Sequence, residues 1–164
     1  MTNEQYIRKN AIVYERYRDE FNTLSPEEIM EFRSETANAF NRIPVNINVQ
    51  FVDGQPYEAL EELTFDIRFN KQIRISSDHN ESRLLGIERN LEFRATHDYL
   101  HFILQAPFTT EGEIKVYHLQ KKLYATELSR QILFSEVVLQ ACYCEYFGKF
   151  ASHQKVILYN PERI

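Results

Sequence analysis

Residues 45–51 read VNINVQF, and this stretch decides the expected fold class. Its odd-numbered positions are apolar and its even-numbered positions are polar, which is typical of a half-buried β-strand. Apolar residues alternate again across 63–69, and Ile73 and Ile75 suggest a further short strand. The Asp53-Gly54 pair is a turn signal between the first two segments. We therefore predict a small antiparallel sheet of about three strands.

Helical patterns lie on both sides of this segment. Apolar residues recur at helical spacing across 4–21, and Ser25-Pro26-Glu27-Glu28 is a strong start signal for a second helix that runs to about Phe40. The spacing becomes helical again from residue 82, with a break at Pro107 and a second stretch over 112–147. The expected fold is α+β, with two N-terminal helices, the small sheet and a helical C-terminal half. Residues 156–159 could add an edge strand.

Composition favours one globular domain spanning residues 1–164. Hydrophobic residues make up 43% of the chain, and 12 Phe and 10 Tyr can fill a core. The net charge of -5 disfavours binding of nucleic acid over the whole surface. No apolar run approaches the roughly 20 residues that span a bilayer. Cys142 and Cys144 flank Tyr143 on an expected helix and cannot form a disulfide there, so we expect a reducing, cytoplasmic location.

His97 and His101 are four residues apart on an expected helix. Side chains at this spacing project from one face, so both imidazoles could bind one divalent metal ion such as zinc. The alternative is that the two histidines belong to the core and hydrogen-bond to nearby acids. The pair alone does not separate these readings.

Two carboxylates could join the histidines. Glu136 lies within the apolar run ILFSEVVL at 132–139, where a buried charge requires a partner. A metal, a histidine, the amide of Gln140 one turn later, or a salt bridge to Arg94 or Arg130 would each serve. Glu113 follows Gly112 at the start of an expected helix, where an acid is favoured by the helix dipole regardless of function.

The stretch FRATHDY at 93–99 resembles the F-R-A-x-H-D-Y signature of an uncharacterised family found mostly in phage genomes and large mobile-element polyproteins. The resemblance continues through Phe108, Gly112-Glu113, Glu136 with Gln140, and Phe150-Ala151 with Gln154-Lys155. It implies a phage or prophage setting, hence the host cytoplasm, and a shared polar site in which Gln140, Gln154 and Lys155 are supporting residues. The family has H-D-Y-F-G-H where this chain has HDYLH at 97–101, and Gln120 stands where a histidine is expected.

Three functions fit these residues. In a metal-dependent hydrolase of zincin-like layout, His97, His101 and Glu136 would hold the ion, and Asp98 or Glu113 would be catalytic. Asp98 is one methylene shorter than the glutamate usual at that position, which argues against peptidase activity. A phosphohydrolase using the His97-Asp98 doublet would need further ligands such as His79 and His118. A non-enzymatic phage accessory protein, binding a host protein, would instead keep the polar residues as a satisfied buried network.

Overall fold

A computed structural model of the chain describes residues 1–160 and is mostly helical. Both predicted N-terminal helices are confirmed, as α1 (Asn3–Arg16) and α2 (Pro26–Phe40). The start signal of α2 works as expected, because Ser25 Oγ accepts from the Glu28 backbone amide while the Glu28 carboxylate accepts from the Ser25 amide.

The C-terminal half is helical, as the spacing predicts. Its longest member, α4, ends just before Pro107, and a short interruption at 121–126 separates α5 from α6. The elements are α4 (Gly86–Leu104), α5 (Thr110–Gln120), α6 (Glu127–Phe134), the π-helical turn η4 (Ser135–Leu139) and α7 (Gln140–Phe147). Because η4 joins α6 to α7 without a break, these three form one continuous helical rod.

The predicted α+β class is wrong, because the described chain is mostly helical, and the predicted sheet is wrong in strand number and direction. Only two strands form among residues 1–160, β1 (Asn48–Val52) and β2 (Gln72–Ser76), and they pair in parallel with Asn48 opposite Gln72. Between them the chain forms α3 (Leu60–Phe65) and the π-helical turn η2 (Asp66–Asn70). A helical crossover returns the chain to the same end of the sheet, so the second strand runs parallel to the first.

The segment 63–69 misled the sequence reading for a definable reason. Its alternating apolar residues divide into two pairs spaced by four, and each pair can share a face of a helix. Leu63 and Ile67 are buried against the strands, whereas Phe65 and Phe69 are exposed and contact each other at a tilt, with ring centroids 4.9 Å apart. Over seven residues, the alternation of a strand and two interleaved i, i+4 pairs of a helix place apolar residues at the same positions.

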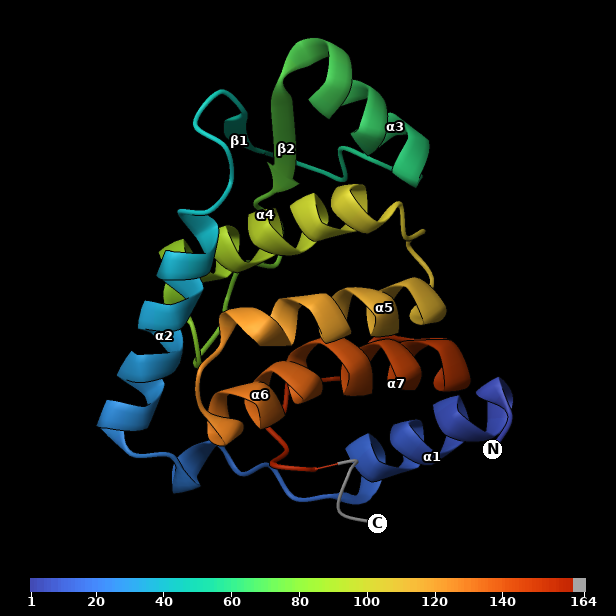
Figure 1. The fold of residues 1–164 in the computed structure, drawn as a ribbon. Helices are drawn as coiled ribbons and strands as arrows, with labels where there is room; N and C mark the ends of the chain where they lie inside the picture. The colour runs from blue at the N-terminus through green and yellow to red at the C-terminus, as the bar shows by residue number, and fades with distance from the viewer. Residues whose placement is uncertain (161–164) are drawn as a thin grey trace.

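The elements are arranged in layers (Figure 1). The strands and α3 lie beyond α4 at one end, α5 lies on the other side of α4, and α6, α7 and α1 form the opposite end, while α2 runs along one side. One hydrophobic cluster fills the end around α1, α6 and α7, and a second fills the end around the strands, α3 and α4. The facing sides of α4 and α5 lie between these two clusters and share a third, smaller one made by Leu100, Ala106 and Val116. Within residues 1–160, no helix is both long and apolar enough to cross a membrane.

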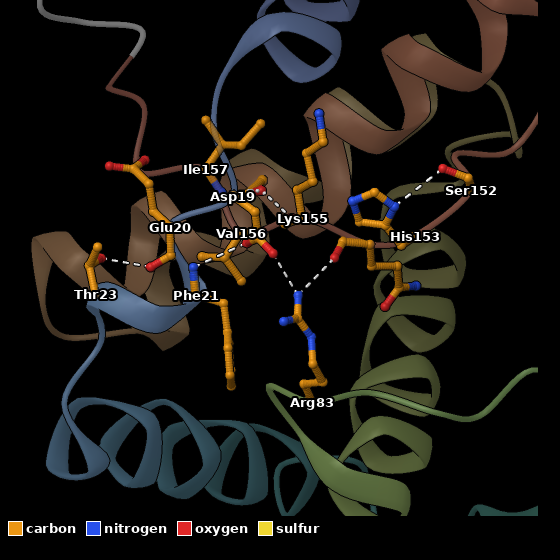
Figure 2. A network of polar contacts seen from close by, with 12 residues as sticks. Asp19, Glu20, Phe21, Thr23, Arg83, Ser152, His153, Lys155, Val156 and Ile157 are labelled. Carbon is orange, nitrogen blue, oxygen red and sulfur yellow. Dashed lines mark hydrogen bonds and ion pairs between the residues drawn. The ribbon is translucent and has the colours of Figure 1, made fainter.

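Residues 156–159 do not form the predicted edge strand. They run as an extended segment beside the loop that follows α1 (Figure 2), where Asp19 accepts from the Val156 amide and Glu20 accepts from the Leu158 amide. The Glu20 amide in turn donates to the Val156 carbonyl. Side chains thus replace most of the backbone pairing that a strand would require.

Candidate metal centre

The facing sides of α4 and α5 bring two histidines together. His97 and His101 lie one turn apart on α4, and their Nε2 atoms are 3.1 Å apart. The rings meet edge to face, with an interplanar angle of 75°. The His101 side chain is fully buried, and the His97 side chain is 14% exposed.

Each ring is oriented through its other nitrogen. The Nδ1 of His101 lies 2.9 Å from the carbonyl oxygen of Ala106, which can only accept, so this nitrogen carries the proton. A left-handed residue, Gln105, ends α4 and turns the chain so that Ala106 folds back beneath His101. The Nδ1 of His97 lies 2.9 Å from Oε1 of Gln120 on α5. Such second contacts commonly fix the orientation of metal-binding histidines.

Glu113 completes the cluster from the first turn of α5. Its Oε2 lies 2.6 Å from Nε2 of His97, and its Oε1 lies 3.2 Å from Nε2 of His101. The preceding Gly112 permits this approach, because a Cβ at that position would lie 1.8 Å from the carbonyl oxygen of Pro107. The Gly112-Glu113 pair therefore has a steric origin: only glycine lets α5 start so close to the loop that leaves α4.

A count of protons shows that this cluster is not self-sufficient. If His101 keeps its proton on Nδ1, its Nε2 is an acceptor that faces a carboxylate oxygen, also an acceptor. If both histidines are doubly protonated, two N–H groups point at each other across 3.1 Å. If only His97 is doubly protonated, its Nε2–H donates to Glu113 and faces the Nε2 acceptor of His101, but the 3.2 Å contact between His101 Nε2 and Glu113 Oε1 still joins two acceptors. Each state leaves a mismatch, which a cation between the two Nε2 atoms and the carboxylate would remove.

The charges of the cluster are strongly coupled. Burial alone would lower the pKa of His97, but the Glu113 carboxylate outweighs it and raises that pKa to about 9. Burial likewise opposes ionisation of Glu113, yet the two histidines hold its pKa well below the usual range. Burial raises the pKa of Asp98 to about 6, against the attraction of the histidines.

The three side chains fit a divalent metal ion. Their ligand atoms all lie within 4.8 Å of one another, and two imidazoles with one carboxylate are a ligand set typical of catalytic zinc. Three protein ligands leave a fourth position for water or substrate. His97 and Glu113 also line an open hollow of about 840 Å³, so this position can be reached from solvent.

The remaining predicted residues occupy three different places. Glu136 and Gln140 line the same hollow, joined by a 3.2 Å hydrogen bond from Gln140 Nε2 to Glu136 Oε2, but Glu136 is not in the converging group. Burial raises the pKa of Glu136 to about 7. Asp98 is neither in that group nor on the wall of the hollow. Gln154 and Lys155 belong to the C-terminal segment, where Lys155 Nζ contacts carbonyl oxygens at the end of α1.

The sequence thus predicted the third candidate ligand, Glu136, on a different helix from the one that brings a carboxylate to the two histidines. The sequence predicts a catalytic role for Glu113. In the structure, the Glu113 carboxylate is the one that lies beside both histidines. The anchors of the two rings were missed. The only signal for Gln120 was its position opposite a family histidine, and the Ala106 carbonyl is backbone, which no side-chain pattern reveals.

Compared with protein-family models, curated proteins and solved structures, the chain matches none of them. The interpretation of this centre therefore depends on its own geometry.

Proposed function

We propose that this chain is a metal-dependent hydrolase whose divalent ion is held by His97, His101 and Glu113. The observation that carries the proposal is the convergence of the two Nε2 atoms and the Glu113 carboxylate, with both Nδ1 atoms turned away onto oxygen atoms. An ion bound there would polarise a substrate carbonyl and lower the pKa of a water molecule. The general-base role of Asp98, the phage setting and the cytoplasmic location stay predictions from the sequence.

The two alternative functions have weaker support. A satisfied buried network would match every acceptor with a donor, which the proton count at His101 and Glu113 does not allow. A phosphohydrolase would need additional ligands, yet among residues 1–160 neither His79 nor His118 is in the converging group. Within the part of the chain that the structure describes, the wall of the hollow also has no lysine or arginine to bind a phosphate.

The proposal is tested by metal content and chelator-sensitive hydrolysis. The chain, purified without a histidine tag and offered zinc, manganese, iron or cobalt, should bind about one ion and hydrolyse members of a panel of esters and amides. Chelation should abolish this activity and fresh metal should restore it. His153→Ala, an exposed histidine that contacts only Ser152 in the described structure, serves as the control. Failure to bind any of these ions would overturn the proposal, and stoichiometric binding without turnover would overturn the hydrolase assignment.

A further inference from the structure

The hollow beside the candidate metal centre has an excess of acids on its wall. Among residues 1–160 its lining includes three acids, Glu113, Glu136 and Glu145, with His97 as the one residue that can carry a positive charge and neither lysine nor arginine. Glu113 is engaged by the two histidines. Glu136 and Glu145 lie on the wall formed by η4 and α7, and their carboxylates are available to a ligand that enters the hollow.

Glu136 has no cationic partner within residues 1–160. Its carboxylate accepts one hydrogen bond, from Gln140, although it has room for about four. The arginines expected to neutralise it are used elsewhere, since Arg94 binds the carbonyl oxygens of residues 76, 78 and 79 and Arg130 binds those of residues 124 and 125.

Arg83 also fails to neutralise Glu136. Arg83 and Glu136 both line a small cavity of about 20 Å³. The Arg83 side chain is nevertheless directed at Asp19, as Figure 2 shows. Its guanidinium pairs with Asp19 at 2.7 Å. A half-buried carboxylate without a cation is costly to ionise, so a cation arriving from the hollow would be favoured.

Aromatic rings complete the wall. Phe93, Phe108 and Phe150 all line the hollow, and Phe150 is 87% exposed at its rim. The faces of aromatic rings attract cations, and their apolar surface also binds the stem that carries a charged group. Carboxylates and phenyl rings on one wall are complementary to an amphipathic cation.

We infer that the hollow binds an organic cation, an ammonium or guanidinium group on an apolar stem. Its charge would face Glu136 and Glu145, and its stem would lie among the three phenylalanines. The inference rests on the proposed function in one respect: the bound cation would be a substrate, or part of one, held beside the metal for hydrolysis. Binding itself does not require the metal, because neither Glu136 nor Glu145 is a ligand.

The test compares ligands that share a benzyl group and differ in charge, on the full chain kept free of metal by a chelator. Benzylamine, benzyl alcohol and phenylacetate are titrated and followed by amide chemical shifts in NMR. Benzylamine should bind about tenfold more tightly than benzyl alcohol, a ratio that one partly buried ion pair supplies, and should shift residues around Gln140 and Glu145. Phenylacetate should bind least.

Matched variants locate the effect. Glu136→Gln should reduce the preference for benzylamine to less than about threefold, and Glu145→Gln, a change at an exposed position that the fold tolerates, should reduce it in part. Glu111→Gln is the control, because Glu111 is an exposed acid of α5 that pairs with Lys115 and does not line the hollow. Acetylated peptides that contain lysine, compared with norleucine peptides that have a free amino terminus, then distinguish a side-chain cation from a terminal one.

Two results would overturn the inference: equal binding of benzylamine and benzyl alcohol, or a preference for phenylacetate. Either result would stand even if the protein binds metal and hydrolyses esters. Conversely, a preference for benzylamine in a chain that binds no metal would support the cation site and overturn only the proposed function.

Discussion

Two carboxylates of this protein, the buried one of Asp66 and the half-buried one of Glu113, have opposite kinds of surroundings. Asp66 accepts from Tyr57, Asn70, Gln72 and Arg74, so that each of its oxygens meets two donors. Glu113 faces two imidazole nitrogens that cannot both donate to it without repelling each other. The first cluster is closed and needs nothing from outside, whereas the second leaves room for a cation that would complete it. A polar cluster points to a ligand when its donors and acceptors do not match.

Removing the carboxylate of the closed cluster should have the largest effect on stability. Asp66→Ala leaves four donors without their acceptor and should lower the free energy of unfolding by about 3 kcal/mol, as measured by urea denaturation. Asp53→Ala, at an exposed acid just after β1 whose side chain accepts, within residues 1–160, from Ser77 alone, should change it by less than about 0.5 kcal/mol. Equal effects of the two variants would show that the Asp66 cluster is not a stabilising network.

Changing the carboxylate of the cluster around Glu113 should affect metal affinity much more than stability. In Glu113→Gln the amide can donate to one histidine and accept from the other, so the metal-free protein should change in stability by less than about 1 kcal/mol. Metal affinity should nevertheless fall by about a hundredfold or more, measured by competition with a chromogenic chelator. A variant that lost stability but kept its metal would reverse the distinction between the two clusters.

The partner that orients His97 should matter less than a ligand. Gln120→Leu keeps the volume of the side chain but removes the oxygen that holds His97 Nδ1, and metal affinity should fall by about 10–100-fold. Gln131→Leu is the matched control, because this amide donates to Glu127 at the surface of α6. Unchanged affinity in Gln120→Leu would mean that the ring is held in place by packing alone.

The smallest expected effects are two pH dependences of metal-free stability. Asp66 has a pKa of about 2 in the fold, below its usual value, so its contribution is present above about pH 4 and is lost as the pH falls through 2. His97 has a pKa of about 9, above its usual value, so its contribution is present below about pH 6.5 and is lost as the pH rises through 9.

Each dependence should amount to about 1–2 kcal/mol in urea midpoints measured across pH, after allowance for partial solvation. Asp66→Asn should remove only the loss of stability at acid pH, and Glu113→Gln should reduce only the loss at alkaline pH. If one variant removed both pH dependences, the two clusters would be coupled.

The sequence predicted well those features that depend on neighbours along the chain. The capping box at Ser25, the break before Pro107 and the common face of His97 and His101 are all decided within one or two helical turns. It failed where distant packing decides. The segment 63–69 satisfies both a strand and a helix pattern, and only burial of Leu63 and Ile67 against the strands selects the helix. The choice of Glu113 over Glu136 likewise depends on how closely Gly112 lets α5 approach the loop after α4.

The contacts of Lys155 have a consequence for how the chain is made. Its backbone amide donates to the Tyr14 hydroxyl, 141 residues earlier, and its Nζ contacts the last carbonyl oxygens of α1. At a synthesis rate of roughly 5–20 residues per second, Tyr14 waits roughly 7 to 28 s on the ribosome for this partner. During that interval the apolar face of α1 also lacks α7, its main packing partner, so this face stays uncovered until the later part of the chain is made.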